Sequence, residues 1–153
     1  MRRGRRGGAL AVLLCAGLAG PLPAAAQVLM GSYYAEIGPE DRRNSSGGAL
    51  SDAGGILQQD RANVHHFGIR HGGEQTDRIF DNPERRATLP DLYRRASRPP
   101  EVEAGILGQG AGGTGGRTGG YRVLVLVCGD GNVPSHVVVD AVGAKRPLGC
   151  APR

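Results

Sequence analysis

One stretch of the sequence decides the fold: YRVLVLVC, from Tyr121 to Cys128. Its centre is an unbroken run of Val and Leu, which is typical of a strand that is buried on both faces. A second strand is expected from His136 to Val142, and the residues between the two, GDGNVPS, favour a turn. We therefore expect an antiparallel hairpin near the C-terminus.

An earlier stretch, from Leu29 to Ile37, alternates between apolar and mixed positions. Tyr33, Ala35 and Ile37 fall on one face of an extended chain, as expected for a half-buried strand. This strand would join the hairpin in a small antiparallel sheet.

A helix is expected between these strands, from an N-cap at Ser51 to about His66, with Gly68 ending it. Asp52 then lies in the first turn, where the helix dipole favours an anion. The apolar side chains of this helix form one stripe: Ala53, Ile56, Leu57, Val64 and Phe67. The stripe predicts that the helix covers the sheet.

Shorter helical turns are expected after the main helix. Asn82 and Pro83 are typical of a cap and a first helical position, Leu92 and Tyr93 indicate a second turn, and Glu101 to Leu107 a third. The fold class is therefore α+β: a small antiparallel sheet, made of an N-terminal strand and a C-terminal hairpin, packed by one main helix and short helical turns.

The segment 105–120 contains nine Gly among its sixteen residues. Such a composition favours a flexible connector without fixed structure, here inside the domain.

The N-terminus predicts an export signal over residues 1–26. Met1 to Arg6 contains four Arg, Ala9 to Gly20 is small or apolar throughout, and a proline-containing break precedes small residues at 24–26. The apolar run is about a dozen residues, whereas a retained membrane anchor needs roughly 20. We expect cleavage after Ala26, which leaves residues 27–153 as a single small domain without a membrane span, periplasmic or secreted.

Removal of this signal changes the charge of the protein. The 153 residues include 19 Lys and Arg against 14 Asp and Glu, a net charge of +5. Without the arginines at positions 2, 3, 5 and 6 the balance is 15 against 14. A nearly neutral surface lacks the clustered cations that neutralise phosphates, so a nucleic-acid partner is not expected.

Export also determines the state of the cysteines. Cys15 leaves with the signal, so Cys128 and Cys150 remain as an even pair in an oxidising compartment. We expect a disulfide between them, which closes a loop of about 22 residues and contributes about 3 kcal/mol to stability.

Asp60 is the charged residue that interrupts the apolar stripe of the main helix, three residues after Leu57. An acid on a buried face needs a partner. The candidates are Arg42 or Arg43, or a hydroxyl of Tyr33 or Tyr34, and the residue is expected to be a structural buried acid. A catalytic reading of the polar run 58–66 is weaker, because one helix turn defines no cleft.

Four histidines could bind a transition metal: His65, His66, His71 and His136. Adjacent helical residues point about 100° apart, so His66 with His71 is a better pair than His65 with His66. Capping of helical carbonyls is the alternative role. Ser135 and His136 could form a nucleophile and a base, but neighbours in a strand are expected to face opposite sides.

The segment from Tyr33 to Gly68 contains IG at 37–38, ED at 40–41, NSSG at 44–47 and QQDRAN at 58–63, followed by Phe67. In these motifs the chain resembles small exported bacterial proteins that have no characterised activity. The resemblance covers about a quarter of the chain. It implies export and assigns no catalytic residue.

The sequence thus favours an exported, disulfide-stabilised domain that is non-catalytic, needs no cofactor and binds an unidentified envelope or secreted protein through the loops flanking the main helix. The alternative is a small metal-binding or hydrolytic periplasmic protein that uses His66, His71 and His136.

Overall fold

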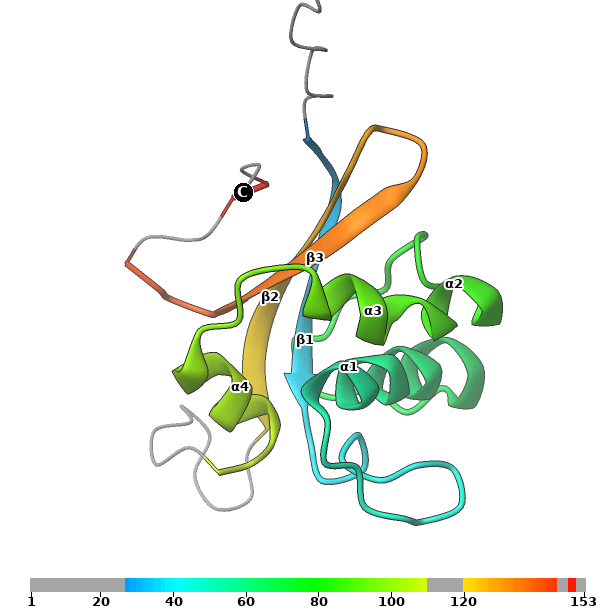
Figure 1. Cartoon of the computed structure of the whole chain (residues 1–153). Coiled ribbons are helices and arrows are strands. Elements are labelled where there is room, and N and C mark those ends of the chain that lie inside the picture. Colours follow the sequence, from blue (N-terminus) through cyan, green and yellow to red (C-terminus); the bar gives the residue numbers. More distant parts are fainter. Residues whose placement is uncertain (1–26, 110–119, 146–148, 151–153) are drawn as a thin grey trace, which may run out of the picture.

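A computed structural model describes residues 27–109, 120–145 and 149–150. It has the expected α+β architecture, a three-stranded antiparallel sheet with helices packed against it (Figure 1). The elements, in chain order, are β1 Val28–Ile37, α1 Ala53–Ala62, the π-helix η1 Asn63–Phe67, α2 Pro83–Ala87, α3 Leu89–Arg94, α4 Pro100–Ile106, β2 Tyr121–Gly129 and β3 Pro134–Ala141.

The sheet has the order β1-β2-β3, so the strongly apolar strand is central. Tyr33 of β1 is opposite Val125 of β2, which is opposite Val139 of β3. These positions lie on one face of the sheet, and all three side chains are buried. The alternation predicted for the first strand is confirmed.

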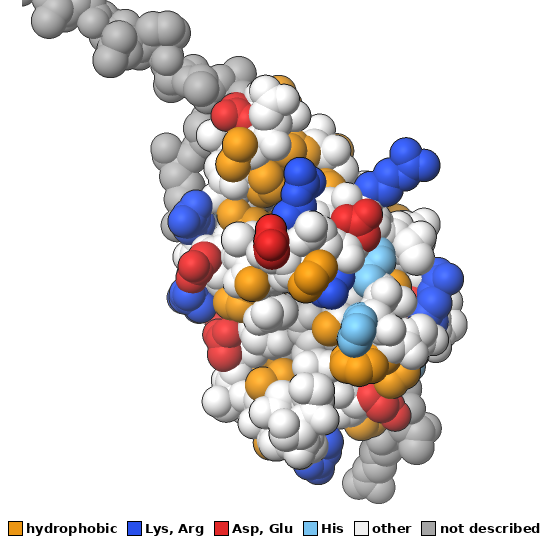
Figure 2. Space-filling view, turned by 90° about the vertical axis from the view of Figure 1, so that its right-hand side faces the viewer, with side chains coloured by type: hydrophobic (Ala, Val, Ile, Leu, Met, Phe, Trp, Pro, Cys, Tyr) orange, Lys and Arg blue, Asp and Glu red, His pale blue; other side chains and the backbone are white. Residues whose placement is uncertain are grey.

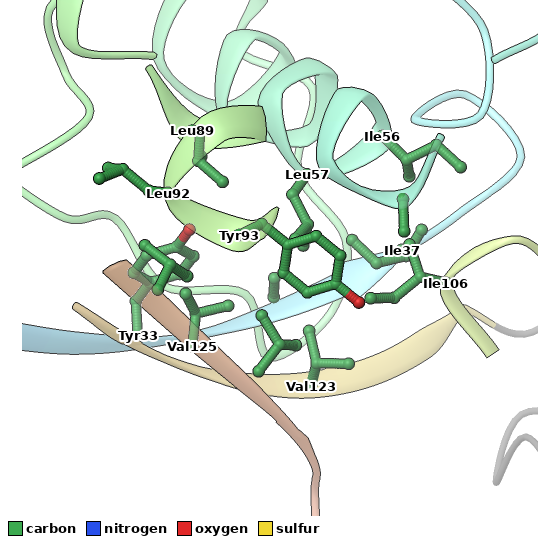
Figure 3. Packing of buried hydrophobic residues seen from close by; sticks show 14 of the residues in the cluster. Tyr33, Ile37, Ile56, Leu57, Leu89, Leu92, Tyr93, Ile106, Val123 and Val125 are labelled. Atoms are coloured by element: carbon green, nitrogen blue, oxygen red, sulfur yellow. The ribbon is translucent and has the colours of Figure 1, made fainter. Parts of the chain in front are cut away.

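The helices cover this face of the sheet. Leu57 of α1 and Tyr93 of α3 point toward Val123 and Val125 of β2 (Figure 3). Ile106 of α4 belongs to the same cluster. The main core is therefore a single layer of apolar side chains between the sheet and the helices.

A second, smaller cluster lies on the opposite face of β2. It contains Leu126 and Cys128, with Val138 of β3 and Ala96. The predicted disulfide joins Cys128 to Cys150, with 5.4 Å between their Cα atoms. Both faces of β2 are thus largely buried, which explains its continuous apolar sequence.

The start of α1 differs from the expectation by one residue. The N-cap is Asp52 and not Ser51, because the Asp52 carboxylate accepts a hydrogen bond of 2.8 Å from the Gly55 amide. A carboxylate at the cap satisfies a free amide and interacts favourably with the helix dipole. The cap predicted at Asn82 is confirmed, and its side chain accepts from the amides of Glu84 and Arg85.

Parts of the predicted organisation lie outside the described residues, namely the export signal at 1–26 and positions 110–119 of the glycine-rich segment. Gly105 and Ile106, which the composition assigned to that segment, instead belong to α4. Among the described helices, none has the length and apolar character required to cross a bilayer.

The adjacent glycines of α1 give a matched test of this packing. A Cβ atom on Gly54 would lie 2.8 Å from the Pro90 backbone, whereas one on Gly55 would meet only Asp52, at 3.5 Å. Gly54→Ala should therefore destabilise the fold by about 1–3 kcal/mol, because α1 and α3 are forced apart. Gly55→Ala should stabilise it by about 0.5–1 kcal/mol through helix propensity.

Urea unfolding of both variants and the wild type measures the two effects. Equal shifts in the same direction would contradict the close contact between α1 and α3.

Candidate functional site

The end of the main helix has an unusual local structure. After Ala62 the chain continues as η1, and the amide of Gly68 donates to the carbonyl of Asn63, five residues earlier. Gly68 has φ of 69°, a left-handed conformation that glycine adopts without strain. Because a π-helix has more residues per turn than an α-helix, the end of the helix leaves the α-helical stripe. Phe67, expected in that stripe, is 49% exposed.

A fully buried arginine lies immediately before this π-helix. The Arg61 side chain is 0% exposed and forms ion pairs with three carboxylates. Its Nε is 2.7 Å from Asp60, and its two terminal nitrogens are 3.2 Å from Glu74 and 3.3 Å from Asp77. We refer to Asp60, Arg61, His65, Glu74 and Asp77 as the Arg61 network.

Asp60 is fully buried within this network, and its partner differs from the candidates that the sequence suggested. Asp60 accepts a hydrogen bond from Arg61, the next residue in the chain, and not from Arg42 or Arg43. Arg42 instead donates to the carbonyls of Ile37, Gly105 and Ile106 and so links β1 to α4. Arg43 donates to the carbonyl of Gly47.

Burial raises the pKa of Asp60 well above its ordinary value, against the opposing effect of Arg61. A hydrogen bond with Glu74 raises this pKa further. The oxygen Oδ1 of Asp60 has no partner as a carboxylate oxygen, but a proton on it can be donated to Glu74. Burial and the neighbouring Glu74 thus favour the protonated form of Asp60, whereas Arg61 favours its carboxylate.

Tyr33 of β1 forms one wall of the network. The guanidinium carbon of Arg61 is 4.2 Å from the centre of its ring, a cation–π contact. The Tyr33 hydroxyl is buried without a hydrogen-bond partner in the described structure, and its pKa is raised, chiefly by burial. The Tyr33 hydroxyl is therefore not the hydrogen-bond partner of Asp60. Tyr33 contacts the network through its ring, which packs against Arg61.

Asp77 connects the network to the following loop. Its Oδ2 is 2.9 Å from Nε2 of His65, and its Oδ1 accepts from the amides of Ile79 and Phe80. Although burial alone would raise the pKa of Asp77, the hydrogen bonds from His65 and Phe80 and the charge of Arg61 lower it. The pKa values of Asp77 and Asp60 are thus shifted in opposite directions.

A second buried acid lies beside the network. Asp41 accepts hydrogen bonds of 2.7 Å from the Gly38 amide and from Nδ2 of Asn63. Nε2 of His71 is 3.3 Å from the Asp41 carboxylate. Burial raises the pKa of Asp41 despite these partners. Asn63 also accepts from Gln59, so it joins the helix to the loop after β1.

A hollow of about 240 Å³ opens above Asn63. We name its lining the helix-end surface: Glu40, Arg43, Asn44, Ser45, Gln59, Asn63, Phe67 and Ile69. Figure 2 looks onto the side of the molecule toward which α1 runs, and it shows hydrophobic side chains beside histidine side chains, with acidic and basic groups interspersed. No single sign of charge dominates this face.

The structure does not bring the candidate metal ligands together. His66 is exposed and packs edge-on against Phe67, His71 contacts Asp41, and His136 is on β3. Among the described residues, no group of three His, Cys, Asp or Glu side chains has the arrangement of a metal site.

Ser135 and His136 differ from the sequence expectation. The Ser135 Oγ lies 2.9 Å from Nδ1 of His136, although neighbours in a regular strand face apart. The reason is a β-bulge: Cys128 is opposite His136 while Gly129 is opposite Pro134, so Ser135 is an additional residue that breaks the alternation.

No family model, curated protein or solved structure matches this chain.

Several members of the site were missed at the sequence level, namely Asp41, Arg61, Glu74 and Asp77. Glu74 and Asp77 lie in an irregular segment, where no periodicity indicates which side chains are buried. One signal in the sequence could have indicated Arg61 as a partner. Asp60 and Arg61 have opposite charges and follow Leu57 on a helix with an apolar stripe.

Asp60 allows a direct test of the buried carboxyl pair. Because its folded pKa is raised, the folded state holds a proton that the unfolded chain loses above about pH 4, so stability falls as pH rises through this window. Asp60→Asn cannot ionise, but keeps an oxygen for Arg61 and an amide donor for Glu74. It should therefore lack this part of the pH dependence, which urea unfolding between pH 4 and pH 8 would measure.

Asp60→Ala is the disruptive counterpart. It leaves Arg61 without its closest partner and should cost about 3 kcal/mol, which lowers the melting temperature by several degrees. Asp81→Asn, at an exposed carboxylate, should keep the wild-type pH dependence. An unchanged pH dependence in Asp60→Asn, or an unchanged melt in Asp60→Ala, would refute the buried pair.

Proposed function

We propose that this protein is an exported, non-catalytic binding domain of the cell envelope that holds a segment of another polypeptide on the helix-end surface. One observation carries the proposal: Phe67 and Ile69 are 49% and 42% exposed at the edge of the hollow above Asn63. Large apolar side chains that lie together on a protein surface often mark an interaction site.

The chemistry of the hollow favours a peptide over other ligands. Glu40 and Arg43 carry opposite charges, so the lining has no preference for a polyanion. The Ser45 hydroxyl and the Gln59 side-chain amide line the hollow and are groups that can pair with a main chain. Together with the apolar edge, this lining suits an extended segment with one apolar anchor residue.

The Arg61 network supports binding by making this surface rigid. Asn63 lies at the base of the hollow and is held by Asp41 and Gln59, while Arg61 holds the following loop through its contact with the carbonyl of Gln75. A surface that is ordered before binding loses less conformational entropy when the partner docks. The buried charges thus act by positioning and contact no ligand themselves.

Two features support export. Residues 1–26 have the three-part composition of a secretory signal. The Cys128–Cys150 disulfide is of the kind that persists in oxidising compartments. An envelope or secreted protein is accordingly the expected partner.

Site-specific crosslinking tests the docking surface. A photoreactive side chain at position 69 should capture one protein in the native envelope fraction, and the same group at position 142, just after the end of β3, should not. The captured protein is then purified and titrated against the full exported domain.

In that titration, the double variant Phe67→Ser with Ile69→Ser should weaken binding at least tenfold, because two apolar contacts are lost. The matched variant Val142→Ser, which also removes an exposed apolar side chain, should bind like the wild type. Equal affinity of the double variant and the wild type would refute the helix-end surface as the docking site.

Elemental analysis addresses the alternative function. Stoichiometric zinc or copper in the purified exported protein, lost on substitution of His66 and His71 by alanine, would favour a metal-binding protein over the binding domain proposed here. We expect no stoichiometric metal, since the structure directs these two histidines to different partners.

A further inference from the structure

A separate polar cluster lies at the start of β1, away from the helix-end surface. The Ser135 Oγ contacts the side-chain oxygen Oε1 of Gln27 at 2.5 Å and the carbonyl of Cys128 at 3.1 Å. Nδ1 of His136 is 2.9 Å from the same hydroxyl. Gln27 is thus held by the β2–β3 hairpin, which lies beside the beginning of β1 (Figure 1).

Two β-bulges produce this arrangement. In β1 the register shifts between Leu29 and Gly31, and in β3 it shifts at Ser135. The shift in β1 is opposite the Val127–Cys128 step of β2, and the shift in β3 is opposite the Cys128–Gly129 step. Bulges re-aim side chains and occur frequently beside functional sites, and here one of them turns the Ser135 hydroxyl toward Gln27.

We propose that Gln27 is a modification site: once it becomes the N-terminal residue, it cyclises to pyroglutamate, and Ser135 promotes the reaction. The inference rests on the proposed function, because export with cleavage after Ala26 is what frees the α-amine of Gln27. The Ser135 contact then places a hydrogen-bond donor on the amide oxygen of the reacting group.

The chemistry needs no further reagent. The α-amino nitrogen of Gln27 attacks Cδ of its own side-chain amide, and a new N–Cδ bond forms. The Cδ–Nε2 bond breaks, and Nε2 leaves as ammonia with a proton transferred from the attacking amine. No oxidation or reduction occurs, and the oxygen Oε1 is retained as the lactam oxygen.

Ser135 acts on the atom where negative charge develops. As the amine adds to Cδ, the oxygen Oε1 becomes an oxyanion, and a hydroxyl donor already in contact stabilises that charge. When the single proton of Ser135 is donated to Oε1, the hydroxyl can still accept from a protonated Nδ1 of His136.

The product also suits its surroundings. Val28 and Leu29 follow Gln27 and are 44% and 56% exposed, and Val133 in the adjacent turn is 63% exposed. An ammonium group beside these apolar side chains loses part of its hydration, whereas the neutral lactam does not carry that cost. Cyclisation thus gives this end of the sheet an uncharged terminus.

Intact-mass measurement of the full chain after expression and export tests the inference. We expect residues 27–153 with one disulfide and a mass lower by one ammonia. A chain that begins at Gln27 and retains its full mass after prolonged incubation would overturn the modification while leaving export intact. A chain that begins elsewhere would overturn both the modification and the proposed cleavage.

Variants of Ser135 test its role in the cyclisation of Gln27. Ser135→Ala should slow cyclisation about tenfold in the exported protein, since one hydrogen bond to the reacting oxygen is lost. Ser135→Thr keeps the hydroxyl and should cyclise at nearly the wild-type rate, and Ser97→Ala, at an exposed serine, should have no effect. Equal rates for Ser135→Ala and Ser135→Thr, both folded, would refute the role of Ser135.

Discussion

The fold depends on how the chain satisfies one buried guanidinium. Arg61 has no exposed surface, and an uncompensated charge at such a position would cost several kcal/mol. Its carboxylate partners come from α1 and from the loop that follows η1, and its aromatic contact comes from β1. Satisfying this one side chain therefore requires the helix, the loop and the sheet to be in their native positions together.

The network places three carboxyl groups around a single arginine, and the surroundings of these carboxyl groups differ. Burial raises the pKa of Asp60, whereas hydrogen bonds from His65 and the Phe80 amide and the charge of Arg61 lower the pKa of Asp77. Helix α1, which contains Asp60 and Arg61, continues into the π-helix η1, where Phe67 is exposed. The buried Arg61 network and the exposed Phe67 thus lie at the same end of the helix. The network holds this end in place, and Phe67 adds apolar area to its surface.

The sequence predicts the strands well because their signals are local. Alternation at Tyr33, Ala35 and Ile37 and the apolar run of β2 follow from burial on one or two faces. The partners of Asp60 were not predictable, because Glu74 and Asp77 approach from a loop whose path depends on the tertiary contacts themselves. The displacement of Phe67 was equally hidden, since a π-turn has no sequence signal separate from the α-helical pattern.

The β-bulge in β3 explains why the alternation rule does not predict the contact between Ser135 and His136. Period-two alternation places Ser135 and His136 on opposite faces, but the additional residue in β3 breaks that rule. Cys128 is opposite the bulge, and its side chain is fixed on the second face of the sheet by the disulfide to Cys150. A slip of β3 by one residue would move Val137 and Val139 out of the main core, so the register is fixed by burial. The additional residue must therefore be accommodated at the hairpin end, and there the Ser135 side chain contacts Gln27, the residue before β1.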